Sequence, residues 1–260
     1  MSTVLITGAT SGIGRAACKL FAQRGGQATK IVAVGRRENL LAEVASEIES
    51  YGAQAMTLSC DVSNRTEITD AIDSLSGEWA DVDILVNNAG LALSGPGKIY
   101  DQDIDDWEQM INVNCKGLMY VTKAVLPGMV ERANGHVVNI GSVAGNYALP
   151  MNNVYCASKA FVNHLSLAMR ADLYGTGVRV TSIEPGNTET EFSIVKFGGD
   201  KSKADKVYEV GSGQRAAMTG DDIAEIIHFC SVGIGKHVNI NRIEMMPERQ
   251  GLGPFVFDRS

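Results

Sequence analysis

The stretch Thr3-Val4-Leu5-Ile6-Thr7-Gly8-Ala9-Thr10-Ser11-Gly12-Ile13-Gly14 predicts the fold of the chain. Its first five residues form a short apolar run that is typical of a buried strand. After Gly14, apolar residues recur at helical spacing as far as Phe21. A strand, a glycine-rich turn and a helix in this order form the phosphate-binding unit of many dinucleotide sites. We therefore expect an α/β fold whose first turn binds a nucleotide cofactor.

Each glycine of this turn has its own expected role. Gly8 permits the tight turn, Gly12 lets a pyrophosphate approach the main chain, and Gly14 allows close contact between helix and sheet. Free N–H groups at the start of the helix would bind the pyrophosphate. A plain turn between two elements is the alternative. We expect the cofactor to contact Gly8, Thr10, Ser11, Gly12, Ile13 and Gly14.

Strand-like and helix-like stretches alternate along the chain. Apolar runs predict further strands at 30–35, 53–59, 82–86, 135–141, 178–183 and, last and shortest, 237–240. Helical patterns lie between or after them at 39–51, 64–75, 102–132, 153–174 and 221–231. This order predicts a Rossmann-type doubly wound parallel sheet of about seven strands, with helices on both faces, in a single domain spanning residues 1–260.

The region 187–218 is the exception to this alternation. It shows no clear hydrophobic period and contains Gly198, Gly199, Gly211 and Gly213. A loop of this length within a compact domain is usually functional, as in an active-site lid. We expect it to be a substrate loop.

Composition and charge exclude several classes of protein. With 45% hydrophobic and 20% charged residues, the 260-residue chain is ordinary for a globular protein. Its net charge of -7 argues against a nucleic-acid partner or an anionic membrane surface. No apolar run reaches the roughly 18 residues of a spanning helix, and strand-like residues from Val4 leave no room for a signal peptide. We expect a cytoplasmic protein.

The five cysteines and four histidines are scattered and show no metal-ligand or redox spacing. We therefore expect no metal site, and free thiols in a reducing compartment. Cys156 stands beside a candidate catalytic tyrosine, but a small packing residue is the simpler interpretation.

The residues after the second predicted strand indicate which nucleotide is bound. NAD-binding proteins carry Asp or Glu here, about 20 residues beyond the glycines, to hold the ribose 2′-hydroxyl. This chain has Arg36 and Arg37 instead. Two guanidiniums suit a 2′-phosphate, whereas two solvated arginines before a helix are the alternative. Given the glycine turn, the pair predicts NADP.

Polar and small residues follow other predicted strands, at the edge where open α/β sheets bind ligands. Asp61-Val62 follows the third strand, and Asp61 could accept from an adenine amino group or cap the next helix. Asn88-Ala89-Gly90 follows the fourth strand and also suits a turn. Pro185-Gly186 ends the sixth strand. We expect all three stretches to contact the cofactor.

Tyr155, Lys159 and Ser142 are the candidate catalytic residues. Tyr155 and Lys159 are four residues apart, so in a helix they lie on the same face. A phenol with a pKa of about 10 is a poor base near neutrality, and a nearby ammonium lowers that value. Ser142 lies thirteen residues before Tyr155, after the fifth predicted strand. Asn114 stands inside a predicted helix, where Asn is unfavourable, and this suggests an internal hydrogen-bonding role.

In their order along the chain, these residues resemble the short-chain dehydrogenases/reductases from Thr3 to about Pro247. The resemblance rests on the glycine turn, Asp61, Asn87-Asn88-Ala89-Gly90, Asn114, Ser142, Tyr155, Lys159 and Pro185-Gly186. It implies an enzyme that transfers a hydride between a nicotinamide cofactor and a CH–OH or carbonyl carbon.

The resemblance also implies the catalytic roles. Tyr155 would be the general acid or base and Ser142 would hold the reacting oxygen, so both would contact the substrate. Lys159 would bind the nicotinamide ribose and lower the pKa of Tyr155, assisted by the charge of the oxidised nicotinamide. Asn114 would bind a water that links Lys159 to solvent.

The resemblance further implies that Thr188 and Thr190 contact the nicotinamide carboxamide. Family members are commonly tetramers or dimers, so a homo-oligomer is expected, a homotetramer by analogy.

Within the family, the chain is similar to the NADP-dependent 3-hydroxy acid dehydrogenases, also described as serine or allo-threonine dehydrogenases. The matching stretches are 83–93, 124–129, 183–186, 190–193 and 244–247. We therefore expect oxidation of the β-hydroxyl of a small 3-hydroxy acid. The chain departs from that pattern in a longer loop at 25–29 and in Lys196, which stands where Arg is expected. If this position contacts a substrate carboxylate, Lys196 offers a single point charge in place of the bidentate hydrogen bonds of Arg.

Two other functions stay open. A 3-oxoacyl thioester or general carbonyl reductase would use the same catalytic residues, although the acidic balance offers no basic patch for an acyl-carrier protein. An NADP-binding regulatory protein usually lacks a catalytic residue, and here all four are present.

Overall fold

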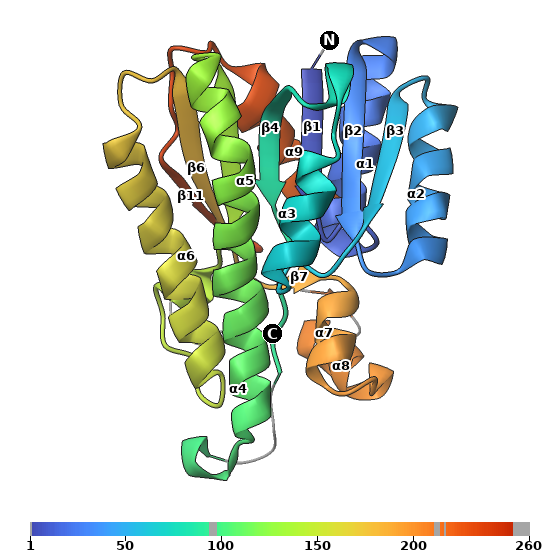
Figure 1. Ribbon diagram of the computed structural model, residues 1–260. Coiled ribbons are helices and arrows are strands. Elements are labelled where there is room, and N and C mark those ends of the chain that lie inside the picture. Colours follow the sequence, from blue (N-terminus) through green and yellow to red (C-terminus); the bar gives the residue numbers. More distant parts are fainter. Residues whose placement is uncertain (1, 94–97, 211–213, 216, 252–260) are drawn as a thin grey trace.

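A parallel seven-stranded sheet with the order β11-β6-β5-β4-β1-β2-β3 forms the centre of the computed structural model, which describes residues 2–93, 98–210, 214–215 and 217–251. Helices cover both faces (Figure 1), so the predicted doubly wound α/β fold is confirmed. The strands of this sheet are β1 Ser2–Thr7, β2 Thr29–Gly35, β3 Gln54–Ser59, β4 Val82–Asn87, β5 Gly135–Ile140, β6 Val178–Pro185 and β11 Arg242–Met245.

The helices divide between the two faces according to which core they bury. In the described residues, α1, α2 and α9 pack on one face, and α3 to α6 pack on the other. Their bounds are α1 Gly12–Gly25, α2 Glu38–Ser50, α3 Arg65–Asp73, α4 Ile104–Ile111, α5 Leu118–Glu131, α6 Asn153–Asp172 and α9 Gly220–His228.

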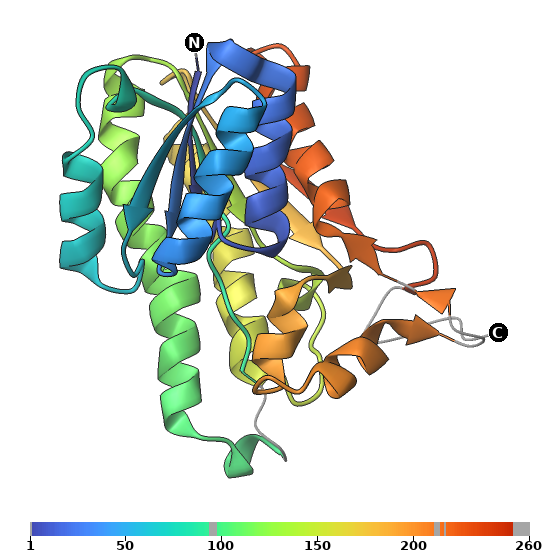
Figure 2. The same cartoon turned by 90° about the vertical axis from the view of Figure 1, so that its right-hand side faces the viewer.

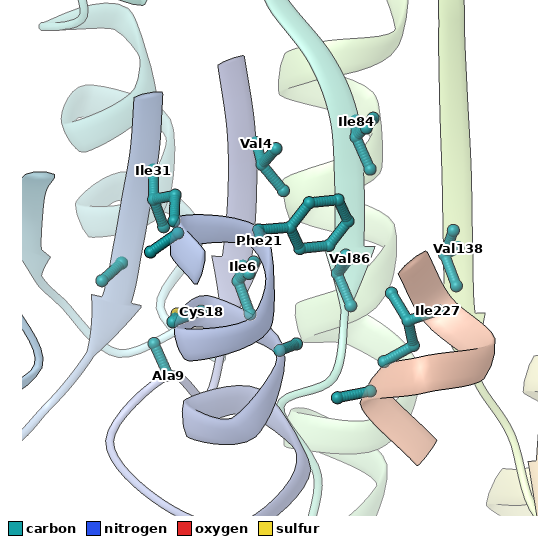
Figure 3. Packing of buried hydrophobic residues seen from close by; sticks show 14 of the residues in the cluster. Val4, Ile6, Ala9, Cys18, Phe21, Ile31, Ile84, Val86, Val138 and Ile227 are labelled. Atoms are coloured by element: carbon teal, nitrogen blue, oxygen red, sulfur yellow. The ribbon is translucent and has the colours of Figure 1, made fainter. Parts of the chain in front are cut away.

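Alternation along the strands fills both cores. Val4 and Ile6 of β1 point to the first face, where they pack with Phe21 of α1 and Ile227 of α9 (Figure 3). Leu5 points to the opposite face and belongs to the second core. Strands buried on both faces need apolar residues at every position, which explains their continuous apolar runs in the sequence.

The strand order brings together the loops that carry the predicted site. The chain runs from β1 outward to β3 on one side, and β4 then returns to pair with β1 on the other. The carboxyl ends of β1 and β4 thus flank a topological switch point, where open α/β sheets bind ligands. Two short helices, α7 Glu191–Lys196 and α8 Lys201–Tyr208, lie beyond this edge of the sheet (Figures 1 and 2).

The predicted substrate loop is more ordered than its sequence indicates. It contains α7 and α8, and its β7 (Thr188–Glu189) pairs with β10 (Met218–Thr219). Both helices are too short to show a hydrophobic period, which is why the sequence did not indicate them. The role of this segment as a substrate loop stays a prediction. Gly198 and Gly199 adopt positive φ between the two helices. Gly211 and Gly213 lie outside the described residues.

The long helical region predicted at 102–132 is confirmed: it runs from Ile104 to Glu131 and contains a π-helical segment, Asn112–Gly117, between α4 and α5. The last predicted strand is wrong. The last strand is β11 rather than 237–240, because the parallel pairing with β6 selects the next segment, with Arg242 opposite Ser182. An alternating apolar pattern marks both segments, and only the pairing distinguishes them.

Candidate active site

A cleft of about 410 Å³ runs along the carboxyl ends of the central strands. Every predicted site residue except Gly14 and Asn114 lines it. The predicted residues in the lining are Gly8, Thr10, Ser11, Gly12, Ile13, Arg36, Arg37, Asp61, Val62, Asn88, Ala89, Gly90, Ser142, Tyr155, Lys159, Pro185, Gly186, Thr188 and Thr190. The structure thus joins residues from most of the chain in one cavity.

The glycine turn has the geometry expected from its sequence. Gly8 and Gly12 adopt φ values of +66° and +52°, which favour glycine. A Cβ on Gly14 would collide with the carbonyl oxygen of Gly8 and with Nδ2 of Asn88. Gly14 therefore serves the contact between helix and sheet, which is why it does not line the cleft. Asn88 fixes the turn to β4, because its Nδ2 donates to the carbonyls of Thr7 (2.9 Å) and Gly8 (3.2 Å).

Arg36 and Arg37 lie at one end of the cleft. The Arg37 guanidinium donates from Nη2 and Nε to Oγ1 of Thr10 (2.9 and 3.3 Å) and pairs with Glu191 at 3.1 Å. Arg36 pairs with Asp61 at 3.5 Å. Exposed ion pairs of this kind contribute only about 0–1 kcal/mol each. A phosphate dianion can therefore compete with both carboxylates for the two guanidiniums.

Asp61 does not cap the next helix. Asn64 is the N-cap of α3, where its side chain accepts from the N–H groups of Thr66 and Glu67. Asp61 instead accepts from the main-chain N–H and hydroxyl of Ser63, at 2.9 and 2.7 Å. The alternative of a capping role is wrong, and the contact with adenine stays a prediction.

Tyr155, Lys159 and Ser142 come together at the other end of the cleft. Tyr155 and Lys159 lie one turn apart on α6, with Nζ of Lys159 6.0 Å from the centre of the tyrosine ring. Tyr155 lies close enough to Ser142 for Ser142 to lower its pKa, while the Ser142 hydroxyl donates from Oγ to the carbonyl of Pro185 at 3.3 Å. The three predicted catalytic side chains therefore share one site.

The pKa values in this site are set mainly by burial. Burial raises the pKa of Tyr155 to about 12, and the interaction with Ser142 offsets only part of this. Burial also lowers the pKa of Lys159 to about 8, and its ammonium donates to the carbonyl of Ile140 at 2.8 Å. The expected lowering of the Tyr155 pKa by Lys159, assisted by the oxidised nicotinamide, stays a prediction. Lowering the pKa of Tyr155 from about 12 to about 7 requires roughly 7 kcal/mol of additional stabilisation of the phenolate relative to the phenol.

Asn114 lies behind the wall of the cleft, in the π-helical segment. Its Oδ1 accepts from the N–H of Leu91 (2.8 Å), and its Nδ2 donates to the Leu91 carbonyl and to Oγ of Ser158 (both 2.9 Å). The predicted internal hydrogen-bonding role is confirmed. A Cβ on Gly90 would lie 3.3 Å from Oδ1 of Asn114 and 3.5 Å from Nζ of Lys159, so the three residues converge. A water held by Asn114 stays a prediction.

Several residues near Tyr155 belong to the site but are not among the site residues predicted from the sequence. Phe192 of α7 packs on Tyr155 with ring centres 5.6 Å apart, and Lys196 of the same helix lines the cleft. Gln250 also lines it and accepts from the N–H of Asn187 at 2.7 Å. Only Lys196 carried a signal, as a departure from the expected Arg. Gln250 reaches the site through the pairing of β11 with β6, which no local pattern reveals.

A family model described as short chain dehydrogenase matches residues 2–198. The chain belongs to this family. Among curated relatives, it is 48% identical over 248 residues to the NADP-dependent 3-hydroxy acid dehydrogenase YdfG of Escherichia coli K12, covering 95% of each chain. It is 45% identical over 257 residues to sulfoacetaldehyde reductase 2 of Chromohalobacter salexigens, covering 98% of each.

Among solved structures, this member of the family resembles the closed form of a serine dehydrogenase complexed with NADP+. The TM-score is 0.88 at 46% identity, and the match covers 99% of this chain and 100% of the other. The likeness therefore extends over the whole fold.

No helix in the described residues is long and apolar enough to cross a membrane. No group of three or more His, Cys, Asp and Glu side chains there could hold a metal ion.

Proposed function

We propose that this chain is an NADP-dependent dehydrogenase that oxidises the β-hydroxyl of small 3-hydroxy acids, such as serine, allo-threonine or 3-hydroxypropionate. One arrangement carries the proposal: a single cleft holds Arg36 and Arg37 at one end, and Ser142, Tyr155 and Lys196 at the other. The names of the relatives, a 3-hydroxy acid dehydrogenase and a serine dehydrogenase with NADP+, support the same assignment.

The residues at the end of the cleft that holds Arg36 and Arg37 fit NADP. The positive φ values of Gly8 and Gly12 open the turn to a pyrophosphate, and the two arginines fit a 2′-phosphate. When bound, NADP+ accepts the hydride from the carbon that carries the hydroxyl. We expect Thr188 and Thr190, which line the cleft, to orient the nicotinamide, and Lys159 to hold the ribose.

The substrate hydroxyl would lie between Ser142 and Tyr155. Ser142 holds the reacting oxygen, and Tyr155 accepts its proton during oxidation or donates one during reduction. Because burial raises the pKa of Tyr155 to about 12, the phenol predominates at neutral pH and suits reduction directly. Oxidation requires a lower pKa, toward which the positive charges of Lys159 and of oxidised nicotinamide would both contribute. We therefore expect the oxidation rate to rise with pH.

The substrate acid group would meet Lys196. This side chain lines the cleft on α7, and its charge interacts with Cys156, the neighbour of Tyr155. Burial lowers the pKa of Lys196, which makes a partner anion more favourable at this position. A carboxylate or a sulfonate would fit, and the sulfoacetaldehyde reductase relative makes the second a specific alternative.

The assignment is tested by NADP reduction with a panel of 3-hydroxy acids, both serine enantiomers and simple secondary alcohols. We expect the highest kcat/KM for a 3-hydroxy acid. A simple secondary alcohol that outperforms every acid would favour a general carbonyl reductase instead. Reduction of sulfoacetaldehyde with NADPH tests the sulfonate alternative.

Replacing Lys196 with Met should raise KM for the best hydroxy acid by about 10- to 100-fold, because a hydrogen bond to a charged group contributes about 1.5–3 kcal/mol. KM for a simple secondary alcohol should stay within about threefold. Lys196→Arg is the matched control and should retain binding of the acid. Equal losses for the acid and the alcohol would remove Lys196 from acid recognition.

We also expect the protein to be a cytoplasmic homotetramer. The cysteines Cys18, Cys60, Cys115, Cys156 and Cys230 are all free thiols, as is usual in a reducing compartment. Tetramers are expected by analogy with the family. Light scattering on the eluting protein measures the assembly, and cell fractionation measures the location.

A further inference from the structure

The main chain of Ser142 is held by a side chain from the catalytic helix. Asn163, one turn beyond Lys159 on α6, accepts from the Ser142 N–H (3.4 Å) and donates to the Ser142 carbonyl (3.1 Å). Both residues are buried, so water does not compete for these bonds. Asn163 therefore ties Ser142, whose side chain would hold the reacting oxygen, to the helix that carries Tyr155.

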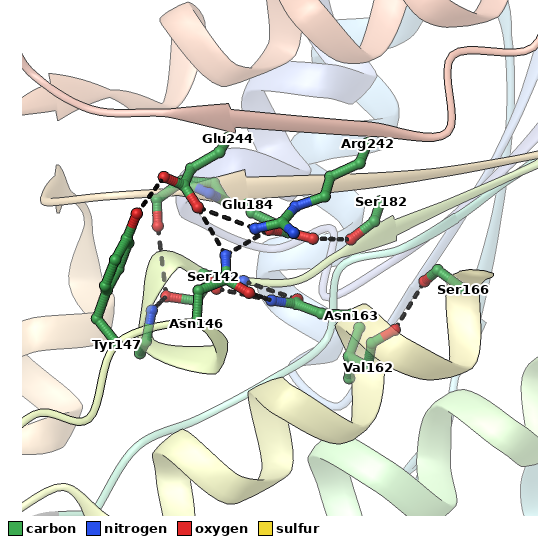
Figure 4. A network of polar contacts seen from close by, with 12 residues as sticks. Ser142, Asn146, Tyr147, Val162, Asn163, Ser166, Ser182, Glu184, Arg242 and Glu244 are labelled. Carbon is green, nitrogen blue, oxygen red and sulfur yellow. Dashed lines mark hydrogen bonds and ion pairs between the residues drawn. The ribbon is translucent and has the colours of Figure 1, made fainter. Parts of the chain in front are cut away.

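The second N–H of the Asn163 amide continues the network outward. It donates to Oδ1 of Asn146 at 3.1 Å, and Nδ2 of Asn146 donates to Glu184 and Glu244, both at 2.7 Å (Figure 4). Every hydrogen-bonding group of both amides is thus used. Two side chains, Asn163 and Asn146, thus link Glu184 and Glu244 to Ser142 by direct hydrogen bonds.

Glu184 anchors this network in the sheet. It is fully buried on β6 and pairs with Arg242 of β11 at 2.7 Å, while Oγ of Ser182 donates to it at 2.9 Å. A buried carboxylate costs several kcal/mol unless ion pairing and hydrogen bonds compensate it. The position of Glu184 is therefore strongly specified. It immediately precedes Pro185, whose carbonyl accepts from the Ser142 hydroxyl at 3.3 Å.

We propose that Asn163 and Asn146, anchored by the Glu184–Arg242 pair, are positioning residues that hold Ser142 in the orientation needed to hydrogen-bond Tyr155 and the reacting oxygen. None of the four is among the predicted site residues or the cleft lining. The alternative is that the network only stabilises the fold. The proposal depends on the acid–base part of the proposed function and not on its substrate class.

The two possibilities differ in their effect on proton transfer. The interaction with Ser142 lowers the pKa of Tyr155, against the effect of burial. Moving Ser142 away leaves burial and the neighbouring Lys159, Cys156 and Phe192 in place, so the pKa of Tyr155 rises. A loss of stability alone leaves that pKa unchanged in the folded protein.

The test measures the pH dependence of kcat for whichever alcohol of the panel turns over fastest. Asn163→Ala should lower kcat near neutral pH by about tenfold or more, because small displacements of catalytic groups are costly. The acid limb of its pH profile, the range in which kcat rises with pH, should move to higher pH by about half a unit or more. KM for NADP+ should stay within about twofold. Asn146→Ala, at an exposed position that should tolerate truncation, should shift the limb in the same direction by less.

Asn239 provides a matched control. Its side chain holds the N–H and carbonyl of Val180 on β6 at 2.8 and 2.9 Å, the same arrangement that Asn163 makes with Ser142. Asn239→Ala should lower Tm without moving the acid limb. An unmoved limb in Asn163→Ala, or an equal shift in Asn239→Ala, would overturn the proposal. If Asn163→Ala does not fold, an unmoved limb in Asn146→Ala would overturn it equally.

Discussion

Replacement of Tyr155 with Phe should lower kcat by about 1000-fold, because general acid–base catalysis contributes about 10²- to 10⁴-fold. The ring that packs against Phe192 is retained, so the cleft keeps its shape and only the proton-transferring hydroxyl is lost. Binding of NADPH, measured by the change in its fluorescence, should stay within about threefold of the unsubstituted protein.

The residual rate of this variant should also lose its pH dependence. Oxidation uses the deprotonated form of Tyr155, so its rate rises as pH increases toward the pKa of that residue; reduction uses the phenol and falls above the pKa. The Tyr120→Phe variant, changed outside the cleft lining, should retain both activity and pH profile. A Tyr155→Phe protein with substantial turnover would exclude the acid–base role.

Replacement of both Arg36 and Arg37 with Ala should lower kcat/KM for NADP by about 100-fold or more, since charge-assisted hydrogen bonds contribute about 1.5–3 kcal/mol each. The same parameter for NAD should change by no more than about threefold, because NAD has no 2′-phosphate for the guanidiniums. Asp61 and Glu191 lose their cationic partners in this variant and would further repel the phosphate. Initial rates with both cofactors measure the change in preference.

A control for net charge is available outside the cleft. Arg24 and Arg132 pair with Glu225 and Asp81, and neither arginine lines the cleft. Replacing both with Ala removes the same two charges and should leave the ratio of NADP to NAD efficiency unchanged. Equal losses with NADP and NAD in the Arg36 and Arg37 variant would exclude their contact with the 2′-phosphate.

The fold and most of the cleft could be predicted because their signals are local. The turn from Gly8 to Gly14 needs residues with particular φ values at fixed spacing, and the helical spacing of Tyr155 and Lys159 follows from sequence separation alone. Parallel strands also place their carboxyl ends at one edge of the sheet. Residues after β1, β4, β5 and β6 were therefore expected together before any contact between them was known.

Prediction from the sequence fell short where pairing or burial outweighed the local pattern. The segment 237–240 alternates like a strand, yet β6 pairs with Arg242–Met245. The spacing of Tyr155 and Lys159 also does not reveal that burial raises the pKa of Tyr155 to about 12. Nor does the sequence reveal that Asn239 contacts the main chain of Val180, or that Lys159 donates to the carbonyl of Ile140.

The amino-acid sequence determines the α/β architecture, the cofactor turn and the four candidate catalytic side chains, because each depends on residues close together along the chain. Tertiary structure alone decides the position of Lys196 and Gln250 in the cleft, the protonation of Tyr155, and the network from Glu184 to Ser142. Those properties depend on the solvent excluded by packing and on partners far apart in sequence, such as Glu184 and Arg242, which only the assembled sheet brings within hydrogen-bond distance.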